Sequence, residues 1–487
     1  MDPRTRWREG LTPMSRSDTL HQSAPALAPT AAPYYLEPPE AYEPEVLEES
    51  ASLGSWRPSG LLEWFAIAQT AVPAMLYLPG NQQSRLAIRA ASFLISIGAF
   101  WFWYLDRPGK YPVPHPANRW LTLVTMVLFL MVIHPDTSSL FAGFGHIALY
   151  FAVFSPMFWV PAFVDSRRRL IRVLAILLVC NGLNSVVGVL QVYDPATWMP
   201  KEFSLSFSQL QLAIATYAGP NGRRIVRPPG LFDTPGAVCG AGAVAALLGL
   251  IFGVEKQFGW WKRLLALGLS FAGMAAIYLS HVRSSMIVTV GTMSAYIVML
   301  AIQKQKQKLT GFLGLAAAML VVALSFATFL GGESVQERFM SVFESNPKDF
   351  YYETRGQQVE TAINVLLVEY PLGAGLARWG MVSNYFKVPS AKAMYAEVQP
   401  AAWIIDGGLP LLILYGLALL SSLMWGLKMV RRLPDPTDRL WASAVVAANI
   451  GTLVLVLTFV PFMTQVGLQF WFLEGLLHGA MAYKIVQ

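Results

Sequence analysis

Arginine is concentrated in a few short stretches of this chain, where its spacing suits the binding of an anion. The stretch RRIVRPPGLFDTPG contains Arg223, Arg224 and Arg227, followed closely by prolines and glycines. Arg283 stands in the stretch YLSHVRSSM, between two apolar runs. A guanidinium group presents a planar fork of N–H donors, which binds phosphate or carboxylate through paired hydrogen bonds. These residues predict an anion-binding site if the fold brings the two stretches together.

The backbone beside Arg227 also suits an anion. Gly230 allows the chain to approach a ligand closely, and Pro228 and Pro229 stiffen the segment. An apolar span starts at about residue 236, so the amide groups of its first turn add a partial positive charge. We therefore expect Gly230 to line the site beside Arg227.

The elements that carry these arginines are predicted to be membrane spans. The chain has 487 residues, of which 55% are hydrophobic and only 13% are charged, and its mean hydropathy is +0.46. Soluble domains carry about 25% charged residues. Long apolar runs recur along most of the chain, so we expect an all-α polytopic membrane protein. Cys180 and Cys239 lie inside apolar runs, which indicates packing rather than metal binding.

About twelve apolar runs approach the ~20 residues that a helix needs to cross a bilayer. They lie at about 61–79, 86–105, 119–134, 144–163, 170–192, 236–254, 263–281, 284–302, 309–330, 399–425, 438–461 and 466–484. The preceding residues, 1–57, are rich in Pro, Ala and Glu and predict a disordered cytoplasmic tail. Residues 58–487 are then the membrane domain.

The charge of the short loops predicts the orientation of these spans. With the N-terminus in the cytoplasm, the loops on the cytoplasmic side are rich in Lys and Arg: DRPGKYPVPHPANR, DSRRRLIR, EKQFGWWKR, QKQKQK and KMVRRLPDPTDR. The short loops on the other side carry only Arg85 and Arg283. Because basic residues are retained on the cytoplasmic side, we expect both termini there. The formal charge of +7 reflects this bias and does not indicate nucleic-acid binding.

Two long connections, at about 193–235 and 331–398, fall on the outer side in this topology. In the second, TRGQQVETAINVLLVEYP has apolar residues at helical spacing, which predicts an amphipathic helix. In the first, FSLSFSQLQLAI alternates like a strand and also fits a short amphipathic helix. The second loop adds three outer arginines, Arg338, Arg355 and Arg378.

The position of the anion site on the outer face of a membrane limits which ligands it could bind. ATP is scarce there, whereas a diphosphate on a lipid carrier suits a site that lines a helix bundle, so we expect a polyprenyl-diphosphate-linked sugar. Arg227 and Arg283 lie at helix ends close to the membrane, where an unpaired charge is costly. For other outer arginines, pairing with loop acids or lipid head groups is at least as good an interpretation as substrate binding: Arg223, Arg224, Arg338 and Arg378.

Three stretches follow one another in an order that is found in a known family. RPPGLFDTPGAVCG is similar to that family's Arg–Gly–Phe–Pro pattern at the start of a span, and SHVRSS to its Ser–Arg turn between spans. ETRGQQVETAINVLLVEYPLGAGLARWG is similar to its large outer loop, with an arginine, an amphipathic helix and a Pro-x-Gly-x-Gly element. Together they resemble the O-antigen ligase and O-antigen polymerase (Wzy-like) superfamily of bacterial membrane glycosyltransferases, over about residues 60–480.

This resemblance implies a GT-C-like fold and a site for undecaprenyl diphosphate at the outer face of the bacterial inner membrane. Carried over by position, Arg227, Arg283 and Arg355 would hold the diphosphate. The implied partners are an undecaprenyl-diphosphate-linked oligosaccharide donor, a glycan acceptor, and flippase and chain-length or export proteins, with no cofactor. We expect an inverting transfer without a metal, because arginine neutralises the leaving diphosphate and the sequence has no cluster of metal ligands.

The chain departs from the family at the general base. Ligases of this family carry a His-Asn pair before the span after the large loop, where this chain reads AEVQPAAWII. Glu397 is therefore the candidate base, with a plain loop acid as the equal alternative. Gln399 and His281, the histidine nearest to an outer arginine, are candidates for substrate binding. Asp406, inside a span, is a further candidate partner for an arginine.

The absence of the His-Asn pair favours a polymerase of lipid-linked oligosaccharide repeat units for a surface or secreted polysaccharide. The alternatives are an O-antigen ligase or protein O-oligosaccharyltransferase of the same superfamily, a non-catalytic assembly subunit and, more remotely, an organic-anion transporter. The lack of sequence repeats, the lack of charged residues in mid-span and the large outer loops argue against transport.

Overall fold

A computed structural model describes the membrane domain with several gaps. The described residues are 60–78, 80, 84–106, 113–199, 215–219, 222–232, 234–344, 351–386 and 393–486. The predicted tail, residues 1–57, and the segment FSLSFSQLQLAI, residues 203–214, lie outside them.

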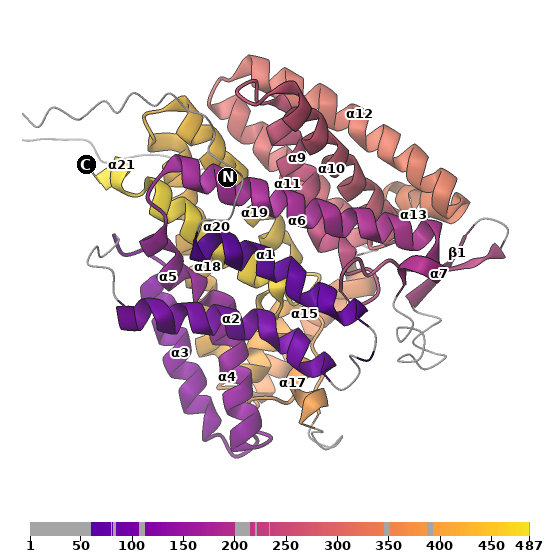
Figure 1. The fold of residues 1–487 in the computed structure, drawn as a ribbon. Coiled ribbons are helices and arrows are strands. Elements are labelled where there is room, and N and C mark those ends of the chain that lie inside the picture. Colours follow the sequence, from indigo (N-terminus) through magenta and orange to yellow (C-terminus); the bar gives the residue numbers. More distant parts are fainter. Residues whose placement is uncertain are drawn as a thin grey trace, which may run out of the picture. The chain divides into compact units, whose positions relative to one another are not determined.

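The described chain is almost entirely helical (Figure 1). Its first part contains α1 (Leu61–Ala74), α2 (Arg85–Asp106), α3 (Asn118–Val132), α4 (Leu140–Phe154), α5 (Pro156–Phe163), α6 (Arg167–Tyr193) and α7 (Pro195–Trp198). A single hairpin follows, made of β1 (Thr216–Ala218) and β2 (Arg224–Val226). Next come α9 (Val238–Val254), α10 (Trp260–Leu279), α11 (Arg283–Ile302), α12 (Lys306–Gly331) and α13 (Glu333–Glu344).

The last part begins with a helical stretch whose hydrogen bonding alternates between α and π turns. Its segments are η4 (Tyr352–Gly356), α15 (Gln357–Thr361), η5 (Ala362–Leu366) and α16 (Leu367–Glu369). The predicted amphipathic helix is therefore present, and Ala362 packs with Val398, Ala401 and Ile404 of the following segment. The chain ends with α17 (Gly380–Tyr385), α18 (Gln399–Arg432), α19 (Pro436–Leu455), α20 (Gln465–Met481) and α21 (Tyr483–Val486).

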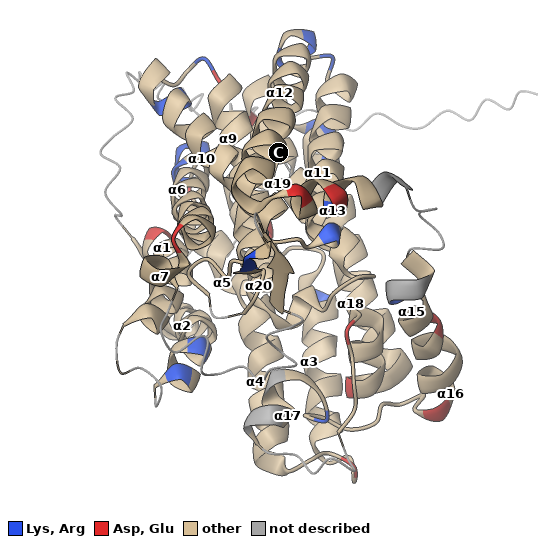
Figure 2. Cartoon of the chain, turned by 90° about the vertical axis from the view of Figure 1, so that its right-hand side faces the viewer, with Lys and Arg blue, Asp and Glu red and all other residues tan. Residues whose placement is uncertain are grey.

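Each predicted span contains a helix, and within the described residues seven helices are long and apolar enough to cross a membrane: Arg85–Leu105, Leu140–Phe163, Arg167–Tyr193, Trp260–Leu279, Arg283–Ile302, Lys306–Gly331 and Gln399–Arg432. Three other apolar helices are shorter: Leu61–Tyr77, Asn118–Val132 and Val238–Val254. The protein is thus a multi-pass, all-α membrane protein. In Figure 2 the long helices are largely free of charged residues, which gather at helix ends and in connections.

Small residues allow the helices that lead to the arginines to pack closely. A side-chain Cβ at Gly242 of α9 would come within 2.7 Å of the Gly273 carbonyl oxygen of α10, and one at Gly273 within 2.6 Å of the Gly242 oxygen. Such close backbone approach is how apolar helices associate without a strong hydrophobic driving force between them. The α9–α10 pair therefore fixes the position of both helix ends at the hairpin.

A break in α18 holds the Pro-x-Gly-x-Gly element of the large loop. Gly407 and Gly408 leave helical geometry, and Gly408 has φ +60°. The Leu409 amide donates to the Pro371 carbonyl at 2.8 Å, and the Ala374 amide donates to the Ile405 carbonyl at 2.7 Å. The loop segment thus satisfies backbone groups that the broken helix leaves open, as the interior of a membrane protein requires.

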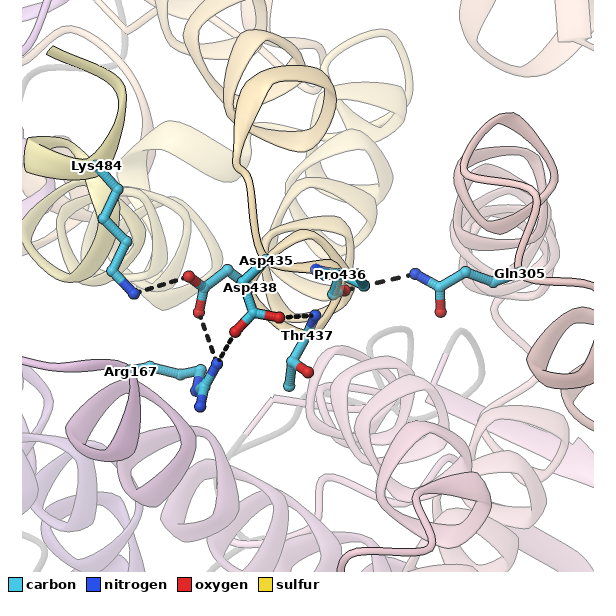
Figure 3. A network of polar contacts seen from close by, with 7 residues as sticks. All are labelled: Arg167, Gln305, Asp435, Pro436, Thr437, Asp438 and Lys484. Carbon is cyan, nitrogen blue, oxygen red and sulfur yellow. Dashed lines mark hydrogen bonds and ion pairs between the residues drawn. The ribbon is translucent and has the colours of Figure 1, made fainter. Parts of the chain in front are cut away.

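Basic side chains at one end of the bundle are paired with carboxylates (Figure 3). Arg167, at the start of α6, donates to Asp435 and, at 3.2 Å, to the buried Asp438. Lys484 donates to the other oxygen of Asp438 at 2.7 Å. Gln305, just beyond α11, donates to the Pro436 carbonyl at 3.5 Å, so the C-terminal end of α11 lies at the same place. We call this region the paired end.

Two further ion pairs also join a basic residue to a buried carboxylate. Arg169 donates to the fully buried Glu63 at 3.2 Å, and Lys308 lies 2.7 Å from Glu255. All these basic residues except Lys484 belong to loops that the sequence predicts to be cytoplasmic. Figure 1 shows α21 at one end of the bundle and α7, β1 and α13 at the other.

Candidate anion-binding site

Arg227 is held by backbone hydrogen bonds on both sides. Its amide donates to the Ala215 carbonyl at 2.8 Å, which extends the hairpin by one residue. Its carbonyl accepts from the Gly236 amide at 3.2 Å, at the approach to α9. Gly236 has φ +75°, in the left-handed region that favours glycine. Arg227 is therefore fixed between the end of β2 and the start of α9.

The start of α9 lies against the turn that carries Arg283. A Cβ at Gly236 would come within 3.0 Å of the Val282 side chain. The Ser285 hydroxyl donates to the Cys239 sulfur at 2.9 Å, which joins α11 to α9. The fold thus brings together the first two of the three stretches that carry the family resemblance, as the prediction of one anion site requires.

His281 contacts both the hairpin and α13 from the turn before α11. Its φ is +57°, which is uncommon for a residue other than glycine. Its ring stacks on Tyr217 of β1 with the ring centroids 3.6 Å apart. Its carbonyl accepts a hydrogen bond from Arg338 Nε of α13 at 3.3 Å. The histidine therefore ties the hairpin and α13 to the turn before α11.

The electrostatics of these groups reflect positive charges that lie close together. Burial, Arg283 and Arg227 together lower the pKa of Arg338 to about 10. Burial, Arg227 and Arg338 lower the pKa of His281 to about 3, so its imidazole is neutral near pH 7. Burial also lowers the pKa of Arg227. Arg227, Arg283, Arg338 and the neutral His281 therefore lie within one region of positive potential. We call these four residues the arginine cluster.

Two polar atoms of the arginine cluster, Arg227 Nε and His281 Nε2, are buried without a hydrogen-bond partner. The hydroxyl of Tyr217, whose ring stacks on His281, is buried without one as well. Among the described residues, neither Arg227 nor Arg338 forms an ion pair with a carboxylate. Asp233, in the connection to α9, lies outside the described residues. Buried donors with uncompensated positive charge are the electrostatic complement of a phosphate group.

Arg338 was not predicted as a site residue. The sequence placed it in the second long loop with no stronger assignment than pairing with a loop acid. It reaches the cluster because α13 starts directly after α12, at Gly332 with φ +88°, and turns back towards the hairpin. The Ser334 hydroxyl donates to the Ala218 carbonyl of β1 and fixes that turn. Its charge alone did not distinguish Arg338 from the other loop arginines.

Other predicted residues of the first loop support the site without belonging to the arginine cluster. Arg223 and Arg224 are exposed on the hairpin. Gly230, with φ +65°, is buried, and its amide donates to Gln191 at 2.9 Å. A Cβ there would lie 2.1 Å from Asn184 Oδ1. Gly230 therefore fixes the loop against α6. Its lining of an anion site remains a prediction.

Arg355 and Glu397 form a separate pair. The two side chains make an ion pair, and Gln358 Nε2 donates to the same carboxylate at 2.9 Å. Burial lowers the pKa of Arg355. Among the described residues we find no hydrogen bond or ion pair that joins Arg355 to the arginine cluster. The residue predicted as a diphosphate ligand and the residue predicted as a base thus bind each other.

Gln399 and Arg378 contact the protein itself. Gln399 is fully buried, and its Oε1 accepts from the Phe462 amide at 2.9 Å. Arg378 donates to the Ala374 carbonyl at 2.8 Å and so braces the loop segment that docks on α18. Both contacts are structural, and substrate binding by either residue remains a prediction.

Asp406 is partnered, but not by an arginine. It is fully buried and accepts from the Tyr150 hydroxyl at 2.7 Å and from Trp379 Nε1 at 2.9 Å. His146 Nε2 lies 3.0 Å from the same carboxylate. The expected pairing of Asp406 with an arginine is therefore wrong among the described residues. Asp406 and the buried Glu474 of α20 are acidic residues within helices, which removes one of the arguments against transport.

The described residues contain no group of three or more His, Cys, Asp or Glu side chains that could hold a metal ion. A scan against models of known protein families finds no match to this chain, and a search of curated proteins finds no similar sequence. Functional inference therefore depends on the site itself.

Proposed function

We propose that the protein is a glycosyltransferase that uses a sugar carried on undecaprenyl diphosphate, and that it polymerises oligosaccharide repeat units. The observation that carries this proposal is the arginine cluster at one end of an apolar helix bundle. Arg227 Nε is buried without a hydrogen-bond partner, and neither Arg227 nor Arg338 forms an ion pair with a carboxylate among the described residues. A lipid-linked diphosphate has the charge to match these donors and an apolar chain to match the bundle.

The chemistry is a single displacement at the anomeric carbon of the donor sugar. An acceptor hydroxyl oxygen forms the new bond to that carbon while the bond from the carbon to the diphosphate oxygen breaks. The leaving diphosphate keeps the electron pair, and Arg227, Arg283 and Arg338 neutralise the developing charge. The anomeric configuration is inverted because attack comes from the face opposite the leaving group.

Glu397 is the proposed acceptor of the hydroxyl proton. A general base must reach the proton that it removes, and the Glu397 side chain is 32% exposed. In this structure the carboxylate is bound by Arg355 and Gln358. Its use as a base requires that the acceptor displaces at least one of these partners, or that Arg355 moves to a bound diphosphate.

Transfer of a finished glycan to lipid A core or to protein is the alternative within the same chemistry, because the donor site would be identical. Incubation of purified protein with undecaprenyl-diphosphate-linked repeat units separates the two. A ladder of products on a gel supports the polymerase, whereas transfer only to added lipid A core or protein supports the ligase. Absence of any transfer, with a protein that still binds the donor, would contradict both.

A further inference from the structure

His281 presents a ring nitrogen that the fold leaves without a partner. The residue is 4% exposed, and its Nε2 is buried without a hydrogen bond. Tyr217 covers one face of the ring, with the two ring planes 21° apart. The backbone of His281 lies in the left-handed region, at φ +57°, which a histidine seldom adopts. The fold thus holds this side chain in place at a cost in backbone strain, and strained residues of this kind cluster at functional sites.

The charged groups that act on the His281 ring from neighbouring elements are positive. Arg227 follows β2 directly, and Arg338 of α13 donates to the His281 carbonyl at 3.3 Å. Arg283, at the start of α11, acts on Arg338 in turn. The stacked phenol of Tyr217 is uncharged, since burial raises its pKa. Among the described residues, no carboxylate opposes these arginines at the ring, so a proton on His281 would add a fourth positive charge.

A bound anion reverses this balance. Both phosphates of a donor that is esterified at each end are negatively charged near neutral pH, and they offset the positive potential of the arginines. An opposite charge nearby favours the charged form of a titratable group, which raises the pKa of a histidine. Protonated His281 then offers the anion a charge-assisted N–H donor, which binds more strongly than a neutral one.

We propose that His281 is a ligand of the bound diphosphate and takes up a proton from the solvent as the anion binds. The neutral imidazole avoids a fourth buried cation before binding, and the imidazolium adds a hydrogen bond to the anion afterwards. The affinity for the donor therefore rises as pH falls, because the complex binds more protons than the free protein does. This inference rests on the proposed function, since the anion is the diphosphate of the donor.

The test is the Kd of a sugar-linked undecaprenyl diphosphate for the purified full-length protein, at about pH 6 and about pH 8. This donor is esterified at both ends, so it lacks the ionisation near pH 6 that a free phosphate end has. Arg338, with a pKa of about 10, keeps its charge over this range. If the anion restores the pKa of His281 to about 6.5, its ordinary value, the donor should bind about fourfold more tightly at the lower pH.

His281→Asn, which tolerates the left-handed backbone, should bind the donor equally at both pH values. His134→Asn, in the connection between α3 and α4, is the matched control and should keep the wild-type difference. Equal wild-type affinity at the two pH values, or an unchanged difference in His281→Asn, would overturn the proposal. Absence of donor binding at both pH values would overturn the proposed function, and this inference with it.

Two further measurements keep the test valid if His281→Asn does not fold. His281→Gly removes the strain of the left-handed backbone and should also bind the donor without a pH dependence. Titration calorimetry of the wild type, in two buffers of different protonation enthalpy, measures proton uptake directly. Uptake should increase as pH is lowered, and binding heats that are the same in the two buffers at the lower pH would contradict the proposal.

Discussion

The two ends of the bundle use basic residues in opposite ways. At the paired end, Arg167 and Lys484 share the buried Asp438. At the other end, Arg338 has Arg283 and Arg227 as its charged neighbours, and its pKa is lowered by burial and by both of them. Helix α11 has 20 residues, which is about 30 Å of helix, and it runs from Arg283 to the vicinity of Pro436. The same side-chain chemistry thus stabilises the fold at one end and, as we propose, binds an anion at the other.

The largest expected effect is the loss of turnover in Arg227→Ala. Removal of one donor that stabilises a leaving group's charge costs about 10²–10³-fold in rate. The measurement is the initial rate of transfer from an undecaprenyl-diphosphate-linked substrate by purified protein. Arg224→Ala, three residues earlier and exposed, is the matched control and should stay within about twofold of wild type. Equal losses of transfer rate in Arg227→Ala and Arg224→Ala would mean that the buried arginine has no special role in turnover.

Glu397→Gln tests the ion pair between Glu397 and Arg355 that precedes α18. If Glu397 removes the acceptor proton, the rate should fall by about 10² or more, with donor binding unchanged. The rate and the donor Kd are measured on the same preparation. A near-normal rate would leave Glu397 only as the partner of Arg355.

At the paired end, Arg167→Ala should affect stability and not chemistry. The change leaves Asp435 without its guanidinium and Asp438 with Lys484 alone, which costs about 1–3 kcal/mol. The expected result is a lower Tm with a normal transfer rate for the folded fraction. A variant that unfolds as the wild type does but fails to transfer would reverse the roles of the two ends.

A further expected effect, seen only on acidification, is a pH dependence of stability from His281. The folded protein keeps this ring neutral down to a pKa of about 3, whereas the unfolded chain binds a proton below about pH 6.5. Protons therefore favour the unfolded state, and the stability from this group is present above about pH 6.5 and declines as pH falls towards 3. Tm should fall less with acidification in His281→Asn, which tolerates the left-handed backbone. Parallel curves for the two proteins would count against this account.

Much of the fold could be predicted from the sequence, because apolar length and loop charge depend on local composition. Each predicted span contains a helix, and the helix predicted in TRGQQVETAINVLLVEYP is present. The arginine cluster could not be predicted from local composition, because its geometry depends on a short hairpin, on the left-handed His281 and on the sharp turn before α13. Local patterns do not specify such long-range contacts. The two glycines at 407 and 408 could have signalled the break in α18, but not which loop segment fills it.

The most direct test is the affinity of the purified protein for an undecaprenyl diphosphate, without any acceptor. Binding is measured for the wild type, Arg227→Ala, Arg338→Ala and Arg224→Ala at one ionic strength. Hydrogen bonds to charged groups contribute about 1.5–3 kcal/mol, so Arg227→Ala and Arg338→Ala should each weaken binding by about tenfold or more, and Arg224→Ala should not. Wild-type affinity in both cluster variants would contradict the claim that the arginine cluster binds a lipid diphosphate.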